Sequence, residues 1–145
     1  MRGLLVAIVL TNLGMTGASA SAQDRGGRVP LRLSPRIRAA QPSKYRSVTD
    51  GKDWRNPYLV IRVDGVEIIS NSIRSRRQVV TVEQLSATLV KLPVDAWPYG
   101  RVVAASDIGL RDANGTHDEP IRLNHQAATK VLEALSIKIE WWPSA

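Results

Sequence analysis

The stretch Tyr58–Ser70, with the sequence YLVIRVDGVEIIS, decides the fold of this chain. Two runs rich in β-branched residues flank Asp64-Gly65, and this dipeptide between such runs is a strong signal for a β-hairpin. We expect a type I′ turn at Asp64-Gly65, because glycine accepts the positive φ that this turn requires. The folded part of the chain therefore contains two antiparallel strands joined by a tight turn.

A helix is predicted after this hairpin, beyond a polar connector that runs from Ser70 to Gln78. Thr81-Val82-Glu83-Gln84 has the form of a capping box, which starts a helix. The apolar residues of this segment recur at intervals of three and four, as on one face of an amphipathic helix. They are Val82, Leu85, Leu89 and Leu92. Pro93 ends the helix, since the residue before a proline is biased away from helical geometry.

A second strand–helix–strand unit occupies the rest of the chain. The apolar run Val102–Ala105 suits a central strand, Pro120 fits the first turn of a helix, and Ile137–Trp141 alternates with the period of a strand. The expected buried face of this second helix consists of Ile121, Ala128, Val131, Leu132 and Leu135. We therefore predict a single α+β domain over residues 54–145, of order β-β-α-β-α-β, with two helices packed on one sheet.

Residues 1–22 have the pattern of a signal peptide. Arg2 supplies a positive charge, residues 4–10 are all apolar, and A-x-A-like cleavage sites end at Ala20 and Ala22. The apolar run is too short to span the hydrocarbon core of a membrane, which needs about 20 residues. We expect an exported protein, periplasmic or secreted, that begins at Ser21 or Gln23.

The positive charge of the chain is concentrated in one segment. The whole chain has 20 Lys and Arg against 13 Asp and Glu, and residues 24–46 hold seven of the basic residues against Asp24 alone. Because this segment also contains three prolines and no sustained apolar period, we expect residues 23–53 to form a flexible arm. Two roles are open for this arm, an electrostatic tether to an envelope polyanion or a solvated spacer. The candidate polyanion-binding residues are Arg25, Arg28, Arg32, Arg36, Arg38, Lys44 and Arg46, with Arg74, Arg76 and Arg77 as a competing cluster.

The aromatic residues suggest a surface for a partner. The chain has four tryptophans and no phenylalanine, and Trp141 and Trp142 are adjacent. Neighbouring residues on a strand point to opposite faces, so only one of this pair can easily enter the core. Trp97, Tyr99 and Trp142 either form a partner surface or cover an edge within the monomer. The last strand carries few charges, so a weak homodimer through it is also expected.

The stretch from Ile61 to about Trp141 resembles the periplasmic domain of the ExbD/TolR biopolymer-transport family. The matching segments are Val63–Val66, Asn71, Val80–Leu85, Val102–Asp107 and Val131–Ile137. This resemblance implies the fold and the periplasmic compartment. In that family a transmembrane helix bearing an aspartate couples proton flow to work across the envelope. The short N-terminal apolar segment here has no acidic residue, so the resemblance does not imply that activity.

Few residues of this chain suit catalytic chemistry. Cysteine is absent, which excludes thiol nucleophiles and thiolate metal sites. His117 and His125 lie eight residues apart, which is not the spacing that places two histidines on one zinc ion. We expect no metal and no cofactor, and a non-enzymatic binding or assembly module whose partner is a protein or an envelope polyanion rather than nucleic acid. The alternative is a small secreted enzyme or enzyme inhibitor that uses the polar loop 107–119.

Overall fold

The computed structural model describes residues 30–70, 76–108 and 118–143. Its strands are β1 (Tyr58–Arg62), β2 (Gly65–Ser70), β3 (Arg76–Val80), β4 (Val102–Asp107) and β5 (Lys138–Trp141), and its helices are α1 (Val82–Val90) and α2 (Glu119–Ala134). The expected signal peptide lies outside the described residues, as do Arg25, Arg28, Arg74 and His117. No helix among the described residues is long and apolar enough to cross a membrane.

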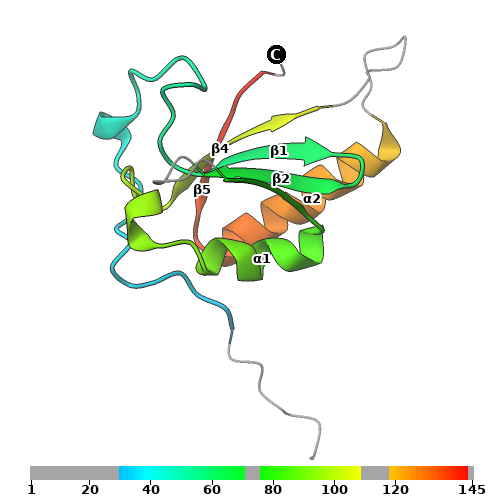
Figure 1. Ribbon diagram of the computed structural model, residues 1–145, viewed down its shortest axis with the longest axis horizontal. Helices are drawn as coiled ribbons and strands as arrows, with labels where there is room; N and C mark the ends of the chain where they lie inside the picture. The colour runs from blue at the N-terminus through cyan, green and yellow to red at the C-terminus, as the bar shows by residue number, and fades with distance from the viewer. Residues whose placement is uncertain (1–29, 71–75, 109–117, 144–145) are drawn as a thin grey trace, which may run out of the picture.

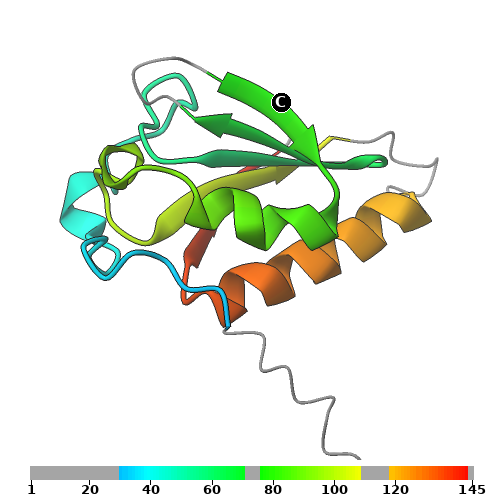
Figure 2. The same cartoon turned by 60° about the horizontal axis from the view of Figure 1, so that its bottom comes forward.

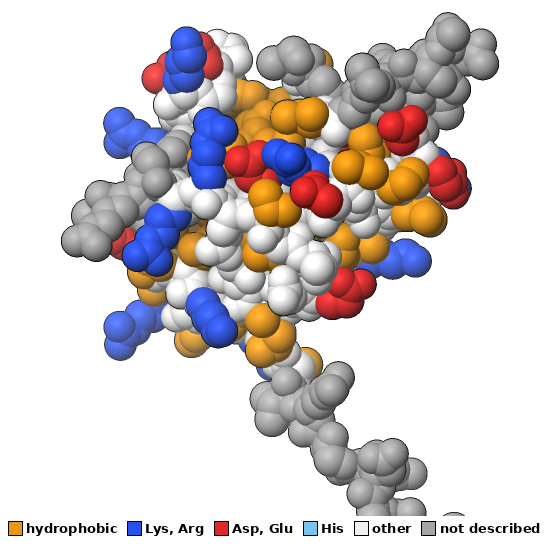
Figure 3. Space-filling view, turned by 45° about the vertical axis from the view of Figure 1, so that its right-hand side comes forward, with side chains coloured by type: hydrophobic (Ala, Val, Ile, Leu, Met, Phe, Trp, Pro, Cys, Tyr) orange, Lys and Arg blue, Asp and Glu red, His pale blue; other side chains and the backbone are white. Residues whose placement is uncertain are grey.

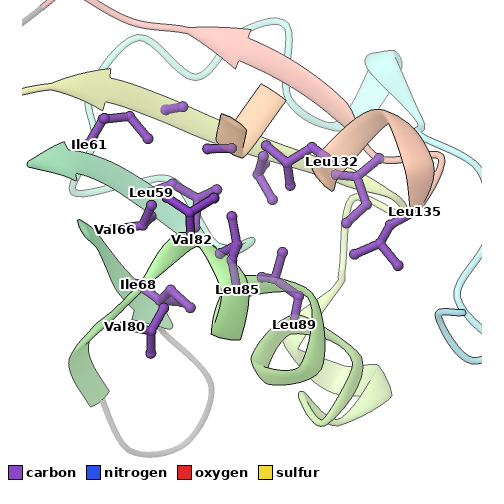
Figure 4. Packing of buried hydrophobic residues seen from close by; sticks show 14 of the residues in the cluster. Leu59, Ile61, Val66, Ile68, Val80, Val82, Leu85, Leu89, Leu132 and Leu135 are labelled. Atoms are coloured by element: carbon purple, nitrogen blue, oxygen red, sulfur yellow. The ribbon is translucent and has the colours of Figure 1, made fainter. Parts of the chain in front are cut away.

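The five strands form one mixed sheet in the order β3-β2-β1-β4-β5. β1, β4 and β5 run parallel to one another, and β2 is antiparallel to both of its neighbours. Both helices cover the same face of the sheet (Figures 1 and 2), and side chains from the two layers meet between them (Figure 4). The core on this side includes Leu59, Ile61, Val66, Ile68, Leu85, Leu89, Val103, Ile121, Leu132 and Ile137. The predicted α+β fold is confirmed, with both helices on one sheet.

The predicted polar connector between the hairpin and α1, Ser70 to Gln78, is wrong at residues 76–78. Residues Arg76–Val80 form strand β3, which pairs with β2 along its whole length. Four of its five residues are exposed, and only Val80 enters the core. The strand lies at the edge of the sheet, where hydrogen bonds to one neighbour hold it and charged side chains are common. Its composition therefore did not identify it as a strand.

The hairpin turn differs from the predicted type I′ turn. Arg62 pairs with Gly65, so the two central residues of the turn are Val63 and Asp64. Neither has a positive φ, because Ser136 is the only non-glycine residue with one in the described part of the chain. Gly65 follows the turn with φ +143°, and a Cβ atom placed there would lie 2.2 Å from the carbonyl oxygen of Val80. Glycine is therefore needed at the start of β2, against the end of β3.

Replacement of this glycine tests that assignment. We expect Gly65→Ala to lower the free energy of unfolding by about 1–3 kcal/mol or more. The φ of this position is unfavourable for alanine, and the added Cβ atom also collides with a backbone oxygen. Gly51→Ala is the matched control, since a Cβ there makes only ordinary contacts with Trp142 and Tyr58. Urea denaturation of the two variants makes the comparison, and an equal effect of both would contradict the assignment.

Residues 30–57 pack against the domain and are called the strap here. Leu33 and Ile37 are buried in the core beside the helices. Tyr45 and Trp54 are buried on the opposite face of the sheet. The strap therefore passes around one end of the sheet from the helix side to the other face, as the blue to cyan segment of Figures 1 and 2 shows. The predicted flexible arm is wrong for the described residues 30–53, because scattered apolar side chains without any period are buried there.

The packing of the strap predicts an unequal effect of two apolar substitutions within it. Ile37→Ala removes a buried side chain and is expected to lower the free energy of unfolding by about 2–5 kcal/mol. Leu31→Ala, at a position that is 50% exposed, is expected to be nearly neutral. Thermal or urea unfolding compares them. A neutral Ile37→Ala would show that residues 30–53 behave as a flexible arm after all.

Candidate functional site

Near the end of the strap, the side chain of Asn56 joins it to the loop before β4. Asn56 is fully buried. Its Nδ2 donates to the carbonyl oxygens of Gly100 and Val102, both at 2.7 Å, and its Oδ1 accepts from the backbone N–H of Tyr99 at 2.8 Å. Both ends of the amide are therefore hydrogen-bonded to the backbone. This one side chain fixes the end of the strap against the start of β4.

Backbone hydrogen bonds fix the middle of the strap to the same loop. Gln41 donates from its backbone N–H to the carbonyl of Tyr99, and Arg101 donates to the carbonyl of Arg38, both at 2.9 Å. Gly100 between them has φ +82°, and a Cβ atom there would lie 2.2 Å from the carbonyl oxygen of Ala39. Only glycine allows the two segments to approach so closely. The strap is therefore a fixed frame for the side chains it carries.

The basic side chains of the strap point to solvent from this frame. The exposed cations are Arg32, Arg36, Arg38, Lys44, Arg46, Lys52 and Arg55. None of them forms an ion pair with a carboxylate of the described residues, whose ion pairs involve other groups. Lys and Arg side chains lie mostly on the left of the face in Figure 3, and Asp and Glu mostly in its centre and right. The strap cations therefore keep their charge free of any ion pair with the described carboxylates.

The competing basic cluster is on a different part of the molecule. Arg76 and Arg77 lie on β3, at the edge of the sheet opposite β5. Arg77 is 3.7 Å from Oε1 of Glu67. The other carboxylate oxygen of Glu67 accepts a hydrogen bond from Arg62 at 3.3 Å. Part of the positive charge on this edge is therefore balanced within the protein. The strap cations have no such partner among the described carboxylates.

Three hollows along the strap are lined by described residues. The first, called the strap hollow, has a volume of about 190 Å³ and lies between the strap and residues 94–100. The second, of about 550 Å³, is lined by Lys44, Arg55 and Asp53 among others, and the third, of about 290 Å³, lies against β5 and contains Arg46, Lys138 and Glu140. The strap hollow is lined by Arg36, Ile37, Arg38, Gln41, Lys44, Val94, Trp97, Pro98 and Gly100.

Two of the three charged side chains in the hollow against β5 are paired with each other. Lys138 donates to Glu140 at 2.7 Å and to the hydroxyl of Tyr45 at 3.4 Å. The hydrogen bond to Glu140, and after it the one to Tyr45, raises the pKa of the Lys138 ammonium. Because this ammonium and carboxylate satisfy each other, the positive charge left to a ligand in this hollow is that of Arg46, and an anion there also meets the carboxylate of Glu140.

The predicted partner surface of Trp97, Tyr99 and Trp142 is wrong. Trp97 and Tyr99 are 4% and 7% exposed, and they belong to different clusters on the two faces of the sheet. Trp142 is partly buried against Trp54, with ring centroids 5.6 Å apart. These side chains cover the sheet within the monomer, which was the alternative. The strap supplies the residues that bury two of them, so the prediction failed where the strap was taken as flexible.

Sequence analysis missed one polar contact at the other end of the sheet. His125 on α2 places Nδ1 3.1 and 3.2 Å from the two carboxylate oxygens of Asp107, at the end of β4. The ring of Trp141 stacks on His125 with centroids 4.0 Å apart and planes 6° from parallel. An Asp at the carboxyl end of a parallel strand could have indicated this site, because ligands of open α/β sheets bind at that end. No group of three or more potential metal-ligating side chains occurs among the described residues.

Comparison with protein-family models, curated proteins and solved structures gives no match for this chain. The resemblance to the ExbD/TolR periplasmic domain therefore stays a prediction. So does the weak homodimer, although β5 does lie at the edge of the sheet.

The frame that carries the strap cations depends on Asn56, which gives a test. Asn56→Ala leaves two carbonyl oxygens and one N–H without their partner in the interior, and each such group costs about 1–3 kcal/mol. We expect a loss of at least about 3 kcal/mol in the free energy of unfolding. Asn124→Ala is the control, because its amide also donates to backbone carbonyls but is only half-buried, so water replaces it. Equal losses in urea denaturation would show that Asn56 does not fix the strap.

Proposed function

We propose that this protein is an exported, non-enzymatic binding module that attaches to anionic lipids or polymers of the cell envelope through the cations of its strap. One observation supports this proposal above the others. The described strap carries seven exposed basic residues against Asp50 and Asp53, and no basic residue among them is paired with a described carboxylate. The pattern of residues 1–22 supports export.

Electrostatics explain why such a strap suits an anionic surface. Each Lys or Arg near an anionic membrane contributes about 1 kcal/mol, without the need for a shaped pocket. A cation paired within the protein has already lost much of this attraction, whereas an unpaired one keeps it. Because the strap backbone is held by Asn56 and by the bonds to Tyr99 and Arg101, binding orders less of the chain than it would with a flexible arm.

The contact between Asp107 and His125 favours a second candidate function, a small enzyme. A carboxylate that orients a histidine is a common part of acid–base sites. Among the described residues, however, no hydroxyl group contacts the ring nitrogens of His125, and one face of the ring is covered by Trp141. The pair therefore has no described nucleophile to activate, and the binding function is the better supported of the two.

Binding to anionic vesicles in a salt series tests the proposal. The full mature chain is compared with Arg32→Gln/Arg46→Gln on the strap and with the matched double variant Arg76→Gln/Arg77→Gln on β3. Loss of two strap cations is expected to weaken binding to phosphatidylglycerol vesicles by about 2 kcal/mol, or about 30-fold. Binding of the parent should collapse as the Debye length falls from about 10 Å at 0.1 M to about 3 Å at 1 M salt.

Two outcomes would contradict this assignment. If only the β3 variant lost binding, the role would belong to Arg76 and Arg77. If the parent chain did not bind at low salt, the strap would be no more than a cover for the sheet. Deletion of residues 24–46 is not a suitable test, because it also removes Leu33, Ile37 and Tyr45 from the interior.

A further inference from the structure

We propose that the strap hollow is a binding site for one phosphate group, and that Arg36, Arg38 and Trp97 are the side chains that recognise it. This inference rests on the proposed function and gives it a specific ligand chemistry. A phosphate group is present in free phosphate and in the headgroups of anionic lipids, and the experiment below separates these two sources.

The distribution of charge among the three hollows favours this one. The strap hollow is lined by Arg36, Arg38 and Lys44 and by no carboxylate. Each of the other two contains two cations together with an acidic residue, Asp53 in one and Glu140 in the other. An anion in either of those meets a carboxylate as well as the cations. In the strap hollow it meets cations alone, and guanidinium groups match phosphate oxygens with two parallel hydrogen bonds.

Trp97 supplies an independent observation. Its side chain lines the strap hollow and is 4% exposed. Its Nε1 is the only buried side-chain polar atom without a hydrogen-bond partner in the described part of the chain. An indole N–H can only donate, and a buried donor without an acceptor is destabilising and rare in folded proteins. Only an acceptor can satisfy this N–H, and a phosphate oxygen is a strong one.

Hydrogen bonds fix the backbone of the strap at the hollow, while the arginine side chains stay exposed. The carbonyl of Arg38 accepts from Arg101, and Lys44 Nζ donates to the carbonyl of Pro98 at 3.4 Å across the hollow. The volume of about 190 Å³ is several times the roughly 30 Å³ that one water molecule occupies in the liquid, so a phosphate group fits. Nε1 of Trp97 is closed to solvent, so contact requires a change of rotamer among the flexible side chains of the hollow. The attraction of the anion for those same side chains favours that change.

The indole N–H signals of the ¹⁵N-labelled full mature chain provide a direct test. Four tryptophans give four signals, and Trp97→Phe identifies the one that belongs to Trp97 because it removes the donor and keeps an aromatic ring. Titration with inorganic phosphate at constant ionic strength is expected to shift the Trp97 signal saturably. The Trp54 signal should stay in place, since its Nε1 already donates to the carbonyl of Pro57.

Matched variants separate a site from general attraction. Arg36→Gln/Arg38→Gln should weaken the affinity for phosphate by about tenfold or more, through the loss of charged hydrogen bonds. Arg32→Gln/Arg46→Gln removes the same charge from the strap outside the hollow and should change this affinity less than about twofold. All four side chains are exposed, so both variants are expected to fold, and the other indole signals check this.

Competition identifies the source of the phosphate. If free phosphate releases the chain from phosphatidylglycerol vesicles more than an equal ionic strength of chloride does, the headgroup occupies the hollow. If free phosphate shifts Trp97 and does not compete, the site stands and takes soluble phosphate. A Trp97 signal that does not move, or equal losses in the two double variants, would overturn the site. Vesicle binding that persists in that case would leave the proposed function intact.

Discussion

A single sheet with both helices on one face leaves the apolar side chains of its other face in water unless a further segment covers them. In this protein the strap is that segment. Tyr45 and Trp54 lie over Val102 and Ala104 of the interior strand β4, and burial of such aromatic surface is a large favourable term in folding. The buried amide of Asn56 makes this possible, because it bonds to the backbone polar groups that the cover would otherwise leave unpaired.

The need to cover the sheet also decides where the positive charge lies. The strap alternates buried anchors, such as Ile37 and Tyr45, with exposed cations, such as Arg38 and Arg46. Its cations are therefore carried by a backbone with few accessible conformations, at the end of the sheet where β4 begins. This arrangement turns a segment with the composition of a disordered tail into a positively charged surface of definite shape. Such a surface can distinguish one anionic group from another, which a flexible arm does poorly.

The two ends of the sheet differ in character. The strap and its hollows occupy the end where β4 begins. Asp107, His125 and Trp141 lie at the end where the parallel strands finish, and there the groups satisfy one another by a hydrogen bond and a stacked ring contact. The hydrogen bond between Asp107 and His125 and the stacked ring of Trp141 stabilise the packing of α2 against the sheet. The strap hollow is instead lined by cations that form no ion pair with a described carboxylate, and by Trp97, whose buried Nε1 has no hydrogen-bond partner among the described residues.

The sequence by itself determined the elements whose side chains follow a period. Within a few residues, a local pattern indicates which side of such an element is buried. Examples are the runs around Asp64-Gly65, the capping box at Thr81 and the apolar face of α2. The elements β1, β2, α1, β4, α2 and β5 were therefore all predicted. Only the tertiary structure decided the fate of β3 and of the strap. An edge strand is held by backbone bonds that no side-chain pattern reports. Asn56 and Gly100 are 44 positions apart in the sequence and meet only in the folded structure. The burial of Trp97 and the grouping of Arg36, Arg38 and Lys44 around it depend on those long-range contacts, because a local sequence pattern encodes the face of an element and not the neighbour that will cover it.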